Sequence, residues 1–285
     1  EAMPEREERR AQAAKHLALM KGAFSTETEA TVAAARVYED GEGRELPIPE
    51  AVFETTETSV TTAFAPAALR DARGKTVVVD PASFTRPGGG YEDGSFGPEQ
   101  ILCSESNLYS ILYGLKNAYH DGNRGCQRGQ LFTDRALYLP NVAFSHAGVI
   151  RKADVVALPE PNRARALENH RSERECDQVL AERIETLLRI AASNGCETLV
   201  CGAFGCGRGG FDTQQVIGLF EDWIRKHPGV IGRIVFAVPR AHAAAFDAAF
   251  GEPKVEEIAP VAADEDEEDD FDLRNIELPE GVTLR

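Results

Sequence analysis

Two glycine-rich loops contain the residues of this chain whose types and spacing are best suited to chemistry. Arg86–Tyr91 (RPGGGY) follows the apolar run Thr76–Val79, and Gly202–Gly210 (GAFGCGRGG) follows a second apolar run, Thr198–Cys201. Glycine lets the backbone approach a ligand closely with φ of either sign, and backbone N–H groups in such loops bind anionic oxygens. Because open α/β sheets bind ligands where their strands end, the loops predict a phosphate-bearing ligand held from both sides.

The segments that must position these loops alternate between strand-like and helical patterns from about residue 76 to residue 250. Such alternation predicts an α/β domain with helices on both faces of a sheet. Residues 4–38 are rich in alanine, leucine, glutamate and arginine and predict two helices, the second beginning at Ser25 or Thr26 and extending through Val37. We expect further strands at 52–62, 76–80, 136–139, 142–144, 153–158, 198–201 and 233–238, and further helices at 65–73, 98–119, 176–192, 213–226 and 241–250.

Composition limits the kinds of partner. The chain has 285 residues and a formal charge of −16, of which seven negative charges form the run Asp264–Asp270. The remaining −9 is still acidic and disfavours binding to bare nucleic acid, which depends on cationic side chains. No run reaches the roughly 20 apolar residues of a membrane span. The six cysteines are scattered, so we expect a reducing, cytoplasmic location and no structural metal.

Residues 77–91 (VVVDPASFTRPGGGY), followed by Leu102-Cys103 and Leu108-Tyr109, resemble the first signature of the bacterial poly(ADP-ribose) glycohydrolases. These enzymes have a macrodomain core with an added N-terminal helical region. The later matches occur in the same order as in that family: Thr133-Asp134, Tyr138-Leu139-Pro140, Pro161-Asn162, Asn194-Gly195 and Gly202–Gly207. The resemblance covers roughly residues 8–250.

The resemblance implies a macrodomain-like, three-layer α/β/α fold with a mixed central sheet. It divides the chain into an N-terminal helical extension (1–50) packed on the core, an ADP-ribose-binding core (51–251) and an acidic, partly disordered tail (252–285). It also implies ADP-ribose or poly(ADP-ribose) as ligand, an ADP-ribosylated macromolecule as partner, and no cofactor. The family's glycine loops flank the pyrophosphate, which here assigns the ligand to Gly88, Gly89, Gly90, Gly205, Cys206 and Gly207.

The chain departs from the family at the catalytic position. Family members follow the triple glycine with Gln-Glu-Glu, whose second glutamate protonates the leaving ribose oxygen. Here the aligned residues are Pro98-Glu99-Gln100, and an amide cannot transfer a proton, a loss that typically costs 10²–10⁴-fold in rate. Three explanations stay open: Gln100 is natural and leaves a reader or a weak enzyme, Gln100 is an engineered substitution, or Glu99 takes over through a shifted helix start. Glu105, a further carboxylate, is expected on a solvated face.

Other departures concern the binding residues. Asp80 stands where the family usually has asparagine, and we expect it to accept a hydrogen bond from a ribose hydroxyl. The family places an aromatic residue two positions after its second glycine loop, where this chain has Gly209, with Phe211 two positions later. Phe211 either covers the distal ribose or packs under the following helix. Arg208 either pairs with phosphate or points to solvent.

The remaining polar and sulfur residues have simpler interpretations. Cys103 and Cys206 lack a visible histidine partner and are expected to pack rather than act as nucleophiles. The histidines His120, His146 and His170 are expected at the surface. The basic loop 123–128 is either a flexible connection or a rim that contacts the adenine side or the modified partner.

Three function classes follow from these residues. The first is a glycohydrolase of ADP-ribosyl O-glycosidic bonds, provided that a carboxylate is available near position 100. The second is a catalytically impaired reader of ADP-ribosylated targets, because Gln100 replaces the family's catalytic glutamate. The third is a regulatory protein that binds another pyrophosphate such as NAD.

Overall fold

The computed structural model describes residues 5–252. A mixed seven-stranded sheet runs through this part in the order β1-β4-β5-β3-β6-β7-β2. The strands are β1 (Arg36–Tyr38), β2 (Glu57–Thr61), β3 (Thr76–Pro81), β4 (Ala136–His146), β5 (Val149–Leu158), β6 (Thr198–Cys201) and β7 (Arg233–Ala237). β5, β3, β6, β7 and β2 are mutually parallel, whereas β4 is antiparallel to both of its neighbours. The acidic run 264–270 lies outside the described residues.

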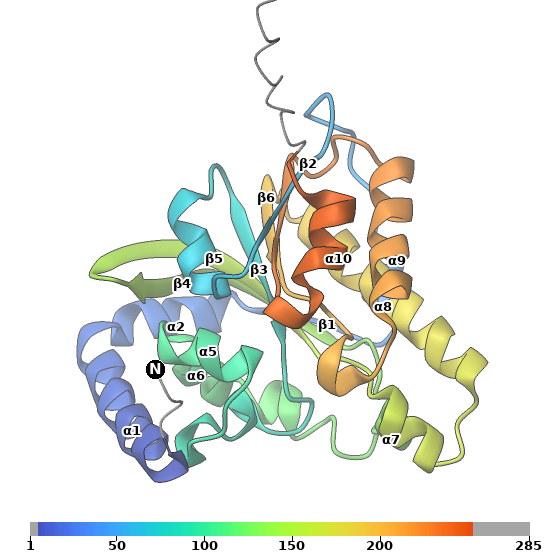
Figure 1. Ribbon diagram of the computed structural model, residues 1–285. Helices are drawn as coiled ribbons and strands as arrows, with labels where there is room; N and C mark the ends of the chain where they lie inside the picture. Colours follow the sequence, from blue (N-terminus) through green and yellow to red (C-terminus); the bar gives the residue numbers. More distant parts are fainter. Residues whose placement is uncertain (1–4, 253–285) are drawn as a thin grey trace, which may run out of the picture. The chain divides into compact units, whose positions relative to one another are not determined.

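Helices cover both faces of this sheet (Figure 1). One face is covered by α8 (Glu173–Ser193), α9 (Thr213–Lys226) and α10 (Arg240–Phe250). The other is covered by α1 (Arg6–Ala23), α5 (Pro98–Ser104), α6 (Leu108–Gly114) and the π-helical turn η3 (Lys116–His120). The shorter elements are α2 (Ser25–Ala34), α3 (Glu42–Glu45), α4 (Ala65–Ala68), η1 (Leu69–Asp71), η2 (Pro87–Asp93), η4 (Arg128–Gln130), α7 (Arg163–Glu168) and η5 (Gly207–Gly209). The expected three-layer α/β/α fold is confirmed.

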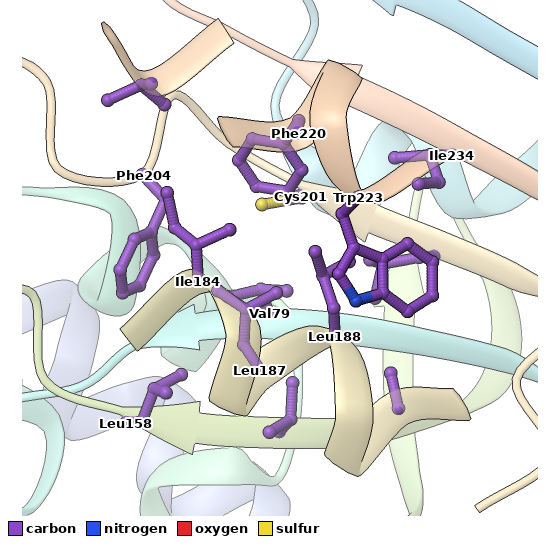
Figure 2. Close-up of a cluster of buried hydrophobic side chains, with 14 of the residues drawn as sticks. Val79, Leu158, Ile184, Leu187, Leu188, Cys201, Phe204, Phe220, Trp223 and Ile234 are labelled. Atoms are coloured by element: carbon purple, nitrogen blue, oxygen red, sulfur yellow. The ribbon is translucent and has the colours of Figure 1, made fainter. Parts of the chain in front are cut away.

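The core is divided by the sheet because successive strand residues face opposite sides. Val77 and Val79 of β3 belong to the cluster under α8 and α9, whereas Val78 belongs to the cluster under α5 and α6. Figure 2 shows the first cluster, where Phe220 and Trp223 of α9 lie near α8 and the sheet. Because β3 is buried on both faces, its carboxyl end is held rigidly, and the first glycine loop starts from a fixed point.

Several expected elements are corrected. Residues 36–38 form strand β1 rather than the end of a helix, because Val37 and Tyr38 pair with β4 and the Tyr38 side chain is buried. The two short strands expected at 136–139 and 142–144 are one strand with a β-bulge between Leu139 and Val142. The backbone N–H of Asn141 in this bulge donates to Asp154 Oδ1 at 2.9 Å.

The single helix expected over 98–119 is divided into α5, α6 and η3, and two buried polar residues account for the break between α5 and α6. Ser106 Oγ donates to the Leu102 carbonyl and accepts from the Leu108 backbone N–H. Asn107 Oδ1 accepts from the Ala143 backbone N–H at 3.0 Å. Such side chain–backbone bonds compete with the helix ladder, so the helix ends and restarts here.

The division of the chain into 1–50, 51–251 and 252–285 remains a prediction. Residues from the first of these segments do contact the sheet and the loops. Thr31 Oγ1 donates to the Pro140 carbonyl at 2.9 Å, and the Arg9 side chain donates to the Gly94 carbonyl at 2.8 Å. In the described part of the chain, no helix is long and apolar enough to cross a bilayer.

Candidate active site

The first glycine loop is pressed against the start of α5. Gly88, Gly89 and Gly90 have φ values of 64°, 56° and 86°, a left-handed region that favours glycine. A Cβ on Gly89 would lie 2.5 Å from Gln100 Nε2 and 2.6 Å from Glu99 Oε2. Only glycine therefore lets this loop lie directly against both side chains.

Glu99 and Gln100 are neighbours in the sequence, and both reach this loop. Glu99 Oε2 accepts from the Ser83 backbone N–H at 2.9 Å, and Gln100 Nε2 donates to the Gly88 carbonyl at 2.9 Å. Both side chains are buried. Among the described residues, Glu99 Oε1 has no hydrogen-bond partner. A carboxyl group is thus present at the glycine loop even though position 100 is an amide.

Burial favours the protonated form of the Asp80 and Glu99 carboxyl groups at this site. Burial raises the pKa of Asp80 to about 8. Burial, and then the nearby Asp80 carboxyl, raise the pKa of Glu99 well above its usual range, against the lowering effect of the hydrogen bond from Ser83. Neither oxygen of Asp80 has a partner in the described part of the chain. Two buried carboxyls with free oxygens can exchange hydrogen bonds or protons with a ligand that reaches them.

The second glycine loop is fixed by a residue that the sequence analysis did not single out. Gly205, with φ of 84°, donates its backbone N–H to Glu160 Oε1 at 2.8 Å. Glu160 follows β5, and burial raises its pKa to about 7. The sequence feature that could have identified Glu160 is its position between Pro159 and Pro161, at the carboxyl end of a buried strand. Glu160 lies behind the loop and sets the direction of the Gly205 N–H.

The two loops are joined by Arg208. Its guanidinium Nη2 donates to the Phe96 carbonyl at 3.2 Å, in the segment that links the first loop to α5. A Cβ on Gly97 would lie 2.9 Å from Gln100 Oε1 and 4.0 Å from Arg208 Nη1. The structure therefore brings Arg208 toward the same helix start as Glu99 and Gln100.

Phe211 and the cysteines lie in the core. The Phe211 side chain is 5% exposed and packs with the larger hydrophobic cluster, which favours packing over a cover for the ribose. Cys206 is also buried, and burial raises the pKa of its thiol to about 11. Burial raises the pKa of Cys103 well above its usual range as well. Neither thiol is ionised near neutral pH, in agreement with a packing role.

The histidines lie at three different depths. The expectation of a surface position is wrong for His120, which is fully buried because the π-helical turn η3 packs it beside Tyr119. Burial lowers the pKa of His120 to about 4. His146 is half-buried and pairs with Glu105, which is therefore not simply solvated. His170 is exposed. No group of three potential metal ligands occurs within residues 5–252.

Comparisons with known proteins agree with this geometry. Residues 8–146 match the family model described as the catalytic domain of microbial-type PARG. A solved poly(ADP-ribose) glycohydrolase from Thermomonospora curvata is 26% identical with a TM-score of 0.76, covering 86% of this chain and 100% of the other. A glycohydrolase from Deinococcus radiodurans solved with ADP-ribose is 26% identical with a TM-score of 0.68, covering 78% and 96% of the two chains. No curated protein matches.

The sheet order, the three layers and the paired glycine loops define a macrodomain-like α/β protein. Within that class, residues 8–146 match the catalytic domain of microbial-type PARG, and the chain is similar to solved bacterial poly(ADP-ribose) glycohydrolases. The matched residues 8–146 include the first glycine loop and α5. The second loop lies beyond them.

Proposed function

We propose that this protein binds a terminal ADP-ribose unit between its two glycine loops and hydrolyses the ADP-ribosyl O-glycosidic bond with Glu99 as the acid. The match to the family model supports the ligand class, as do the solved relatives described in complex with ADP-ribose or with the inhibitor ADP-HPD. Gly88, Gly89, Gly90, Gly205, Cys206 and Gly207 are the proposed ligand-binding positions. Asp80 is proposed to bond a ribose hydroxyl, and Arg208 to contact phosphate.

One observation carries the catalytic part of the proposal. Glu99 is a buried carboxyl that touches the first glycine loop, keeps one oxygen without a partner within the described residues, and has a raised pKa. A buried carboxyl with a raised pKa is suited to general acid catalysis. Gln100 has the opposite properties, since its amide has no proton to transfer and is bonded to the Gly88 carbonyl.

The proposed reaction is hydrolysis through an oxocarbenium-like state. The Glu99 carboxyl gives its proton to the glycosidic oxygen as the bond from that oxygen to the anomeric carbon breaks, and the leaving ribose departs as a hydroxyl. The resulting Glu99 carboxylate takes a proton from water, whose oxygen bonds to the anomeric carbon. The reaction consumes one water, replaces the glycosidic bond by a bond to the water oxygen, and returns Glu99 to its protonated form without a cofactor.

The reader alternative depends on Gln100. In that case the amide anchors the first glycine loop through Gly88 and the protein retains ADP-ribose without cleaving it. The comparisons do not favour this alternative, since the matching family model and the similar structures are those of glycohydrolases. A binder of another pyrophosphate such as NAD would be separated by competition with ADP-ribose.

The decisive experiment measures ADP-ribose release from poly(ADP-ribose) by the unaltered chain and by Glu99→Gln, Gln100→Glu and Glu105→Gln. We expect slow turnover by the unaltered chain, a loss of about 10²–10⁴-fold in Glu99→Gln, and faster turnover in Gln100→Glu. Glu105→Gln is the matched control and keeps full turnover, because Glu105 pairs with His146 away from the loop. Calorimetric binding of ADP-ribose is expected in all four proteins.

Each contrary result has a distinct meaning. If Glu99→Gln turns over as fast as the unaltered chain, the acid is another group. If only Gln100→Glu turns over while ADP-ribose still binds, the unaltered protein is a reader. If ADP-ribose does not bind to the unaltered chain, both functions are wrong.

We also propose an ADP-ribosylated macromolecule as the partner and a cytoplasmic location. The location is supported by the state of the cysteines, since all six are free thiols and five of them are buried. A reducing compartment keeps thiols in this form. Fractionation of cells that express the tagged protein tests the location.

A further inference from the structure

An open cavity of about 520 Å³ is lined in part by the first glycine loop and does not include Glu99 or Gln100. Its wall includes the loop residues Arg86 and Pro87, together with Tyr109, Tyr113, Lys116 and Arg124. The Gly88 carbonyl accepts from Gln100, whereas a Cβ on Gly88 would lie 2.6 Å from Tyr109 Cδ2. Gly88 thus lies between Gln100 of the candidate active site and Tyr109 of the cavity wall.

Two tyrosines form a flat platform at this cavity. Tyr109 and Tyr113 lie one turn apart on α6, with ring centroids 6.2 Å apart and an interplanar angle of 21°. Tyr113 is 62% exposed, although it is a large aromatic side chain. Tyr109 is only partly exposed, so the exposed Tyr113 ring, backed by Tyr109, provides the surface on which a nucleobase stacks. The glycohydrolytic chemistry proposed above makes no use of this platform.

Three cations surround the platform in a chain whose net charge is −16. Lys116 and Arg124 both pair with Asp121, and Arg86 pairs with Glu92 and Asp93. The side chains of Arg86, Lys116 and Arg124 are 49%, 38% and 65% exposed, respectively. Exposed ion pairs contribute only about 0–1 kcal/mol each, so a phosphate can approach these cations without disrupting the fold. The arginines also have N–H groups left for bidentate contacts with phosphate.

We propose that this cavity binds the nucleotide unit next to the terminal ADP-ribose of the same polymer. Its adenine would stack on Tyr113 and Tyr109, and its phosphates would contact Lys116 and Arg124. The inference rests on the proposed function, because the terminal unit occupies the glycine loops. The basic loop 123–128 then acts as a rim toward the polymer, and the protein prefers polymer over single ADP-ribose units.

The test compares single ADP-ribose with ADP-ribose oligomers of defined length by calorimetry. Oligomer binding is measured in the Glu99→Gln background so that the oligomer is not consumed. We expect the oligomer to bind more tightly than the monomer. Tyr113→Ala is expected to weaken oligomer binding roughly 5- to 150-fold, the range that corresponds to loss of about 1–3 kcal/mol of base stacking, with monomer binding unchanged. Arg124→Ala is expected to weaken oligomer binding and to reduce its salt dependence.

Matched controls separate the cavity from general surface effects. Phe64→Ala removes an aromatic side chain that is 57% exposed, and Arg225→Ala removes an arginine from an i,i+3 pair with Asp222 like that of Arg124 with Asp121. Both controls should bind the oligomer as the parent does. Circular dichroism confirms that each variant is folded.

Three outcomes would overturn the inference. The first is equal affinity for monomer and oligomer. The second is that Tyr113→Ala weakens monomer binding and oligomer binding by the same factor. The third is equally tight binding of an oligoadenylate RNA, which would make the cavity a general nucleic-acid site. Absence of monomer binding would contradict the proposed function instead, and the cavity would still be supported if oligomer binding depended on Tyr113.

Discussion

Replacing Asp80 by asparagine removes a fully buried carboxyl. We expect the free energy of unfolding of this variant to decrease less steeply with rising pH than that of the parent. Burial raises the pKa of Asp80 from 3.8 to about 8 in the folded protein. Between these two values the folded protein keeps a proton that the unfolded chain has lost. Unfolding then releases that proton, so the free energy of unfolding decreases as pH rises.

The expected magnitude follows from these pKa values. A single proton of this kind changes the free energy of unfolding by about 1.4 kcal/mol per pH unit. From pH 5.5 to pH 7.5 the contribution of Asp80 is therefore about 3 kcal/mol. In a domain of about 250 residues this corresponds to roughly 6–12 °C in Tm. Asparagine cannot bind that proton, so the variant loses this part of the slope.

The assay is urea unfolding followed by circular dichroism at pH 5.5, 6.5 and 7.5, without ligand. Other buried groups also contribute to the slope, including Glu99 and Glu160 with raised pKa values and His120 with a lowered one. Subtracting the parent's free energy of unfolding from that of the variant at each pH cancels the contributions of titrating groups that Asp80 does not influence. Any cost of burying the asparagine amide is independent of pH, so it shifts the variant's free energy of unfolding by the same amount at every pH.

Asp222→Asn is the matched control. Asp222 lies at the surface, and its hydrogen bond with Arg225 lowers the pKa of Asp222 below 3.8, so it stays ionised throughout the tested range. This variant should keep the parent's slope. If Asp80→Asn also keeps the parent's slope, Asp80 is ionised in the folded protein. The assignment of two protonated carboxyls at the site would then be wrong.

Three further changes test the loop and the core. Gly89→Ala places a Cβ 2.6 Å from a Glu99 oxygen, on a residue whose φ is 56°. We expect calorimetry to show at least a tenfold loss of ADP-ribose affinity. Unchanged affinity would mean that the ligand binds elsewhere. Phe220→Ala, in a fully buried position, should lower the free energy of unfolding by about 3–5 kcal/mol. The control Phe64→Ala should change it by less than about 0.5 kcal/mol. Similar losses for the two variants in urea unfolding would contradict the described core. Arg183→Met removes the buried guanidinium that donates to the carbonyls of Pro159 and Leu131, and two unsatisfied carbonyls should cost about 2–5 kcal/mol; a neutral effect would show that these carbonyls find other partners.

The sequence by itself determined the loops and the strands that lead into them. Consecutive glycines after an apolar run predicted a backbone that only glycine adopts, and Gly88, Gly89 and Gly90 all have positive φ. The apolar run at 76–79 predicted a strand, and β3 lies in the middle of the sheet. These features are local, because φ preferences and side-chain periodicity depend on neighbouring residues.

The tertiary structure decided where short segments and polar side chains lie. Val37 and Tyr38 follow a helical sequence, but pairing with a strand about a hundred residues away makes them part of the sheet. His120 is polar and near a loop, yet η3 turns it into the core. In both cases the free energy of long-range packing exceeds the local preference, which is small for a single residue.

The chemistry of the site also depended on the tertiary structure. The sequence identified Glu99 and Gln100 as the alternatives, and helical geometry placed them in different directions. Only the folded loop shows that both side chains reach Gly89. The protonation of Asp80 and Glu99, the support of Gly205 by Glu160 and the tyrosine platform all arise from residues that are separated in sequence. Burial and proximity set these properties, and both are consequences of how the whole chain packs.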